Sequence, residues 1–208
     1  RENSFYESDD YKHIRLSFSH YSELISKTKR GGKQFGFALA EHSILDECEK
    51  LDVDFYKILS QDINNKVLIK NILKTNKPIY ISTGLSNFSE IGKLVRFIKP
   101  NIKNVTLIHT TLRPDIKYVN LNAITELSEK FHIPVAFGNH CKNPLVLFAA
   151  IAYKPSDIFF YVKGTKFRHH QDDLHAIKLE DLGWYVKNLK ELSLSPGTKS
   201  KMKLTAPP

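Results

Sequence analysis

Several features that mark common protein classes are missing from this sequence of 208 residues. It contains only two cysteines, Cys48 and Cys141, which are too few for a disulfide scaffold and form no C-x-x-C pair. No run of eighteen apolar residues is present, and the first residues have neither the apolar stretch nor the cleavage site of a secretion signal. We therefore expect reduced thiols, a cytoplasmic location and no membrane partner.

Signatures of nucleotide and nucleic-acid binding are also absent. Neither the G-x-G-x-x-G pattern nor the G-x-x-x-x-G-K-[ST] pattern occurs. The net charge is +9, but the lysines are scattered, without a dense block or a stripe interleaved with aromatic residues. We therefore expect no nucleic-acid partner and give more weight to a small anionic substrate.

The residues that are present predict an α/β domain. Apolar side chains make up 41% of the chain, enough for one hydrophobic core. Short apolar runs typical of buried strands alternate with stretches of helical spacing, and the strands begin about 20 to 28 residues apart, the length of one βα unit. This alternation predicts a parallel sheet covered by helices. The predicted strands are 34–40, 54–59, 78–82, 105–109, 133–138 and 157–162, and the predicted helices are 18–29, 42–51, 66–74, 86–98, 121–131, 144–153 and 179–192.

Polar side chains at the strand ends favour a barrel over a doubly wound sheet, the other architecture compatible with this pattern. All strands of a barrel end at one face, where an active site can form. A complete (β/α)8 barrel has about 250 residues, so we predict an incomplete TIM-type barrel of six βα units over residues 1–192. Residues 193–208 are predicted to be a C-terminal linker or tail. The polar strand-end residues are Lys57, Ser60, Ser82, Thr83, His109, Thr110, Thr111, Asn139, His140 and Lys163.

Four stretches of the chain resemble the N-acetylneuraminate (sialic acid) synthase family. They are D-F-Y-K-I-L-S at 54–60, K-P-I-Y-I-S-T-G-L-S at 77–86, L-I-H-T-T at 107–111 and G-N-H at 138–140. By this resemblance, which extends from about residue 16 to residue 192, the six strands are the third to eighth of the family's barrel.

The resemblance also implies a function. The family condenses phosphoenolpyruvate with the aldehyde of an N-acylated amino sugar, releases phosphate, and uses a divalent metal, Mn or Mg. The products are nonulosonic, sialic-acid-like sugars for surface polysaccharide, and we expect the enzyme to be a homodimer.

Individual roles follow from the same resemblance. Lys57 and Ser60 are expected to contact phosphoenolpyruvate, whose phosphate and carboxylate suit an ammonium group with neighbouring hydroxyl donors. Lys57 and His109 are the predicted catalytic residues, with His109 facing the barrel mouth. His140 is the predicted metal ligand. The remaining residues predicted to bind substrate are Ser82, Thr83, Thr111 and Asn139.

The chain departs from the family pattern at several of these positions. Ala38 replaces a threonine, Gly138-Asn139 replaces Ser-Asp, and the shortened segment 111–114 replaces the family's Asn-x-Tyr. The family's Glu-x-His, which supplies a second metal histidine, falls on 159–162, and a lone histidine holds a hard divalent ion poorly.

Two questions stay open at this point. The family's Pro-Asp-His corresponds to about 172–174, and His169 and His170, beside Asp172 and Asp173, are alternative metal donors. Arg113 is a further candidate for anion binding. The alternative function is a degenerate, non-catalytic barrel that serves as an anion-binding or scaffold subunit.

Overall fold

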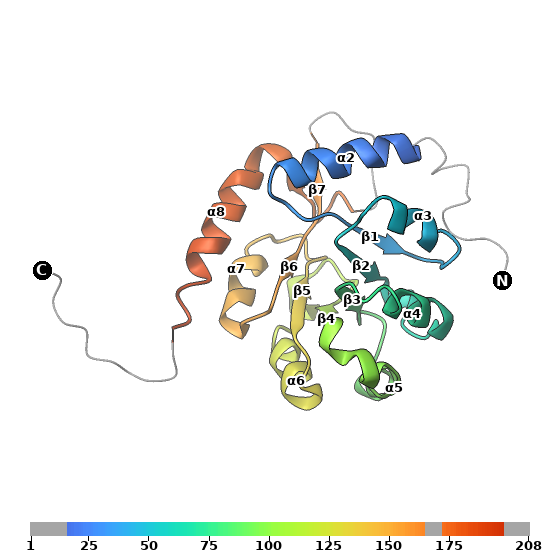
Figure 1. Ribbon diagram of the computed structural model, residues 1–208. Coiled ribbons are helices and arrows are strands. Elements are labelled where there is room, and N and C mark those ends of the chain that lie inside the picture. Colours follow the sequence, from blue (N-terminus) through green and yellow to red (C-terminus); the bar gives the residue numbers. More distant parts are fainter. Residues whose placement is uncertain (1–15, 165–171, 198–208) are drawn as a thin grey trace, which may run out of the picture.

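Six short parallel strands form the centre of the molecule in the computed structural model, which describes residues 16–164 and 172–197 (Figure 1). Their order across the sheet, β1 to β6, is the order in the sequence. A doubly wound sheet would reverse its strand order at one point, whereas a barrel does not. The strands are β1 (Gly36–Leu39), β2 (Phe55–Ile58), β3 (Ile79–Ser82), β4 (Val105–Thr110), β5 (Val135–Gly138) and β6 (Ile158–Phe159).

The sheet curls around an interior. Tyr80 of β3 and Phe159 of β6 lie on strands that are not neighbours in the sheet, yet their ring centroids are 4.9 Å apart. The Lys57 ammonium of β2 also lies 5.5 Å from the centroid of the Phe159 ring. These contacts cross the concave side of the sheet. The predicted incomplete TIM-type barrel is therefore confirmed.

The two faces of each strand have different environments because side chains alternate along a strand. In β2, Tyr56 and Ile58 are fully buried on the face that meets the helices, and the Tyr56 hydroxyl donates to Glu49. Lys57 lies between them and points to the concave interior. The apolar core therefore lies between sheet and helices, and the interior is left for polar groups.

The helices cover the convex side of the sheet (Figure 1). In α5, Ile91, Leu94 and Ile98 form one buried stripe, and Asn87 and Glu90 form a capping box that begins the helix. Within the described ranges, no helix is long and apolar enough to cross a membrane. The helices are α2 (Phe18–Arg30), α3 (Leu45–Lys50), α4 (Lys66–Leu73), α5 (Phe88–Ile98), α6 (Asn122–Phe131), α7 (Val146–Ala150) and α8 (Leu182–Leu192).

The predicted strand 157–162 is divided in the structure. Its first part is β6, and its end is β7 (Val162–Lys163), which pairs with β8 (Ile177–Lys178) in a separate two-stranded parallel sheet. The backbone amide of Ile177 donates to the Tyr161 carbonyl at 2.8 Å, so the chain leaves the main sheet there to meet a later segment. β8 was not predicted from the sequence, because a strand of two residues is too short to show an alternation of apolar and polar side chains. The predicted boundary between the barrel and the C-terminal tail, at residue 192, coincides with the end of α8. The division of the chain into these two parts stays a prediction.

Gly36 provides a test of the register between β1 and β2. A Cβ atom at Gly36 would lie 2.4 Å from the Phe55 ring and 2.6 Å from the Phe55 carbonyl oxygen. We expect Gly36→Ala to lower the free energy of unfolding by about 2 kcal/mol, because the paired backbone must move. Gly183→Ala is the control: its Cβ would meet nothing within 4 Å on α8, and we expect about 0.5–1 kcal/mol of stabilisation from helix propensity. Urea unfolding measures both, and equal effects would contradict the register.

Candidate functional site

Lys57 is the charged side chain at the carboxyl end of β2, and it projects into the barrel interior. It is partly buried, with its ammonium over the Phe159 ring. Among the residues that the structure describes, no carboxylate lies within ion-pair distance of its Nζ atom. Burial lowers the pKa of Lys57, and the more distant charge of Asp172 partly opposes that shift. An enclosed cation without a paired acid is suited to an anionic ligand.

A second polar cluster surrounds His140, which follows β5. Its Nδ1 atom is 2.8 Å from the Thr110 hydroxyl at the end of β4, and its Nε2 atom is 3.3 Å from the Tyr161 hydroxyl. The His175 ring centroid is 4.9 Å from that of His140 and 4.8 Å from that of Tyr161. Four segments that are separate in the sequence therefore meet in this cluster.

The electrostatics join this cluster to Lys57. Burial, followed by the positive charges of His175 and Lys57, lowers the pKa of His140 to about 4. His140 is therefore a neutral imidazole at pH 7. Burial also lowers the pKa of His175, and Asp172 raises it in part. The Asp172 carboxylate lies 3.3 Å from His175 Nε2, within ion-pair distance but outside hydrogen-bond geometry.

The described residues do not fit the metal site that the resemblance implies. Both ring nitrogens of His140 already face hydroxyl groups, those of Thr110 and Tyr161. Tyr161 lies in the segment onto which the family's second histidine falls. Within 16–164 and 172–197, no three His, Cys, Asp or Glu side chains are placed to hold a metal ion. The alternative donors His169 and His170 lie outside the described residues.

Hydroxyl groups at the next strand ends bind the backbone of neighbouring strands. Ser60 Oγ accepts a hydrogen bond from the Gly84 amide at 3.1 Å, and Thr83 Oγ1 donates to the Ile108 carbonyl at 2.9 Å. Ser82 is buried and shares the inner face of β3 with Tyr80. These contacts hold β2, β3 and β4 together at the mouth. The substrate roles of Ser60, Ser82 and Thr83 stay predictions.

His109 faces the helices, which corrects the expectation that it faces the mouth. Thr110 points inward to His140, so its neighbour His109 points outward because side chains alternate along β4. Its Nε2 atom lies 2.9 Å from the Val119 carbonyl, and burial lowers its pKa. We therefore treat His109 as an anchor for the loop after β4. Thr111 is partly buried at the start of that loop.

Asn139 also has a structural contact in the loop after β5. Its side chain accepts from the Cys141 amide at 3.0 Å and donates to the Cys141 carbonyl at 3.1 Å. Arg113 is exposed, with its guanidinium 6.0 Å from the centroid of the Tyr118 ring. The Asn139 side-chain bonds to Cys141 stay within its own loop, and the binding roles of Asn139 and Arg113 stay predictions.

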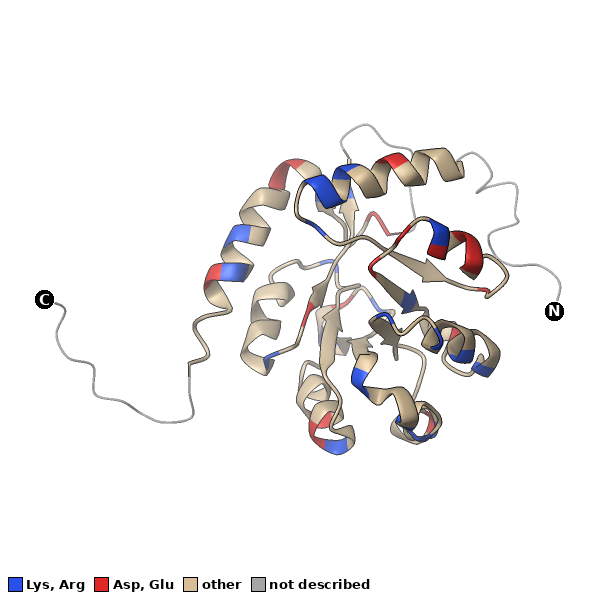
Figure 2. Ribbon diagram, in the orientation of Figure 1, with Lys and Arg blue, Asp and Glu red and all other residues tan. Residues whose placement is uncertain are grey.

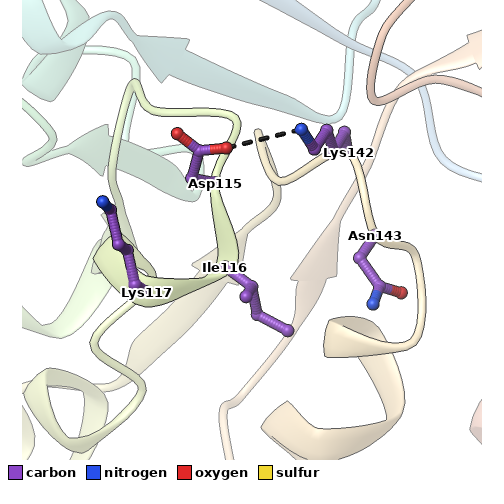
Figure 3. A pocket seen from close by; sticks show the side chains of 5 residues that line it. All are labelled: Asp115, Ile116, Lys117, Lys142 and Asn143. Carbon is purple, nitrogen blue, oxygen red and sulfur yellow. Dashed lines mark ion pairs between the residues drawn. The ribbon is translucent and has the colours of Figure 1, made fainter.

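A cavity of about 400 Å³ opens beside these loops (Figure 3). It contains none of the predicted site residues, and an ion pair of 3.4 Å between Lys142 and Asp115 crosses it. The Lys142 amide also donates to the Pro114 carbonyl. The loops after β4 and β5 therefore form one continuous wall of the cavity. Basic and acidic residues are interspersed over most of the outer helices (Figure 2). The chemistry-bearing residues thus lie at the strand ends and not in this cavity.

Three members of the His140 cluster, Thr110, Tyr161 and His175, were not among the site residues predicted from sequence. Thr110 was noted only as a polar strand-end residue. His175 directly follows the segment 172–174, which was matched to the family's Pro-Asp-His. Moving that match by one residue along the chain would have placed its histidine on His175. Tyr161 lies in the segment 159–162, which was noted only because the family's Glu-x-His falls on it. Tyr161 and His175 are near in space to His140 because of β7 and β8, which sequence periodicity did not show.

The curled parallel sheet, whose strands end in polar side chains at one end, defines an incomplete TIM-type barrel. The chain belongs to the NeuB family, whose model matches residues 2–201. It is 30% identical over 207 residues to an uncharacterised protein of Methanocaldococcus jannaschii, covering 97% of this chain and 61% of that protein. It is 29% identical over 198 residues to the N,N'-diacetyllegionaminic acid synthase of Campylobacter jejuni, covering 91% of this chain and 59% of that enzyme.

Solved structures agree on the fold. The N-acetylneuraminic acid synthetase of Leptospira borgpetersenii, crystallised with citrate, superposes with a TM-score of 0.85 at 21% identity and covers 97% of this chain and 73% of its own. A DAHP synthase of Thermotoga maritima gives a TM-score of 0.75 at 15% identity, over 86% and 56% of the two chains. The chain thus spans about three fifths of the length of the two curated relatives described above.

Proposed function

We propose that this chain is the barrel of a synthase that condenses phosphoenolpyruvate with the aldehyde of an N-acylated amino sugar. The product is a nonulosonic, sialic-acid-like sugar for surface polysaccharide, and phosphate is released. The enzyme acts as a homodimer in the cytoplasm. Legionaminic, pseudaminic and sialic acid synthases among the relatives support this reaction class.

Lys57 is the observation that carries the proposal. Phosphoenolpyruvate brings two anionic groups, and an ammonium in a partly buried site binds them more strongly than one in water does. No carboxylate of the described residues pairs with Lys57, and the cost of burying its charge is offset when an anion binds. Ser60, two residues beyond the end of β2, accepts a hydrogen bond from the Gly84 amide at the same edge of the barrel.

The neighbouring cluster supplies uncharged hydrogen-bond donors. His140 is neutral at pH 7, so its cluster with the Thr110 and Tyr161 hydroxyls forms a polar wall beside Lys57 that adds no charge to the site. Lys57 and these donors lie at the same end of the barrel. One anionic and one carbonyl substrate can therefore meet there.

A thermal-shift titration of the full chain with phosphoenolpyruvate tests the proposal. Binding to the native state raises Tm with ligand concentration, and pyruvate, which lacks the phosphate, is the matched control. Phosphate release is then measured with N-acylated amino sugars as acceptors. No change in Tm at millimolar phosphoenolpyruvate would contradict the proposal.

A degenerate, non-catalytic barrel is the second candidate. The absence of three metal donors from the described part of the chain favours it. In that case phosphoenolpyruvate or another anion raises Tm, but no acceptor sugar leads to phosphate release. The two measurements therefore separate the candidates.

A further inference from the structure

Most of the positive charge of the chain is concentrated in one stretch. Residues 63–114, which include α4 and α5, contain nine lysines and arginines and a single acidic residue, Glu90. This stretch therefore carries a net charge of +8, against +9 for the whole chain. Figure 2 shows basic residues on α4, whose sequence contains no acidic residue. The outer side of this part of the barrel attracts anions.

The lysines of α4 form a row along the helix. Lys66, Lys70 and Lys74 follow one another at intervals of four residues, so they lie one turn apart on one side, and all three are exposed. Within the described ranges, none of the three pairs with a carboxylate. Lys74 donates to the neutral side chain of Asn71 at 3.1 Å. Like charges one turn apart repel, so an anionic partner would stabilise this helix.

A cavity of about 470 Å³ lies beside this row, between α4 and the 3-10 segment η3 (Lys99–Asn104) that follows α5. Its apolar part is formed by Leu73, which is buried, and Phe97, which is partly buried. The Asn104 side chain donates to the Asn76 carbonyl at 3.2 Å and joins the two loops there. The lining residues are Lys70, Leu73, Lys74, Asn76, Phe97 and Asn101, without a carboxylate among them.

This cavity lies at the end of the barrel opposite the mouth. Asn76 precedes β3 and Asn101 precedes β4, so both residues lie near the amino ends of their strands. Lys57 lies near the carboxyl end of β2. A molecule bound in the cavity therefore does not compete with a substrate at the mouth.

The aromatic ring in the cavity distinguishes between two kinds of polyanion. Sites for single-stranded nucleic acid combine a basic groove with aromatic rings on which bases stack. The Lys66 ammonium lies over the Phe97 ring, 5.6 Å from its centroid, and no second aromatic residue is among the described residues of the lining. An acidic peptide needs no stacking surface. Its carboxylates suit lysines one helical turn apart, and an apolar side chain between them suits Leu73 and Phe97.

We infer that the groove between α4 and η3 is a docking site for an acidic, amphipathic segment of a partner protein. Carboxylates of that segment pair with Lys70 and Lys74, and an apolar side chain packs against Leu73 and Phe97. The inference is independent of the proposed function because the two sites lie at opposite ends of the barrel.

Fluorescence anisotropy with the full chain tests the inference. The probe is a short labelled peptide with a Glu-Glu-Leu-Leu repeat, and its matched control has glutamine in place of every glutamate. We expect saturable binding of the glutamate peptide at low ionic strength and weaker binding as salt screens the charges. We expect no saturable binding of the glutamine peptide. No binding of the glutamate peptide, or equal binding of both peptides, would overturn the inference.

The double variant Lys70→Gln/Lys74→Gln locates the binding site. It removes two exposed charges and keeps residues that favour a helix, and we expect affinity for the glutamate peptide to fall about fivefold or more. The matched control is Lys187→Gln/Lys190→Gln, which removes two exposed lysines one turn apart on α8. We expect its affinity to stay within about twofold of the wild type. An equal loss in both variants would mean that binding follows net charge alone and would overturn the inference.

Two competition experiments complete the test. Phosphoenolpyruvate should not displace the glutamate peptide, and displacement would place the peptide at the barrel mouth and contradict the inference. A labelled oligothymidine of similar length should bind more weakly than the peptide. Tighter binding of the oligothymidine that is lost in Lys70→Gln/Lys74→Gln would assign the groove to nucleic acid instead.

Discussion

Lys57→Met is expected to abolish the rise in Tm that phosphoenolpyruvate produces and to raise the Tm of the ligand-free protein. The first effect follows from the loss of the ammonium that binds the anion, which should weaken affinity about 100-fold. The second follows from burial. No described carboxylate pairs with Lys57, and burial lowers its pKa, so the charged form is destabilised in the fold.

Methionine is the appropriate replacement because it keeps the length of the side chain. Its thioether packs well against an aromatic ring, here that of Phe159. We therefore expect the free energy of unfolding at pH 7 to increase by about 1 kcal/mol or more. Alanine would leave a cavity and obscure this gain.

Lys66→Met is the matched control for this experiment. Lys66 also places its ammonium over an aromatic ring, 5.6 Å from the centroid of Phe97, but it is exposed on α4. We expect its free energy of unfolding to change by less than about 0.5 kcal/mol and its response to phosphoenolpyruvate to remain that of the wild type. Undiminished affinity in Lys57→Met would remove Lys57 from the proposed site.

Acid should destabilise the protein through His140. Its pKa of about 4 in the folded state lies below the ordinary value of 6.5, so the unfolded chain takes up this proton first. Stability from the neutral ring is fully present above pH 6.5 and is lost as the pH falls toward 4. Between pH 7.5 and pH 4, this one group should lower the free energy of unfolding by about 3 kcal/mol.

The variant His140→Gln isolates this contribution. Glutamine keeps a polar side chain and does not titrate. Urea unfolding at a series of pH values, without ligand, should show a smaller loss of stability in the variant, by about 3 kcal/mol at pH 4. An identical loss in both proteins would mean that His140 is not buried as a neutral ring.

Much of the fold was predictable because local patterns determine it. Apolar runs and helical spacing identified six strands and their helices, and polar strand ends favoured the barrel. The same reasoning placed Lys57 at the carboxyl end of β2 and inside the barrel, as the structure shows. These features depend on side-chain period and on the order of neighbouring elements, which the sequence contains directly.

The direction of individual side chains was less predictable. His109 and Thr110 are consecutive, and only the register of β4 with β5 decides that Thr110 meets His140 while His109 meets the Val119 carbonyl. A shift of one residue would exchange their faces. The sequence alone could therefore name this pair but not assign its roles.

By itself, the sequence determined the α/β class, the incomplete barrel, the family and the lysine at the mouth. Only the tertiary structure decided that Tyr161 and His175 join His140 in one cluster. The reason is physical: the pairing of β7 with β8 joins two short segments separated by a loop, and neither segment is long enough to show a period. Such a contact depends on how the closing sheet brings distant strand ends together, which no local pattern encodes.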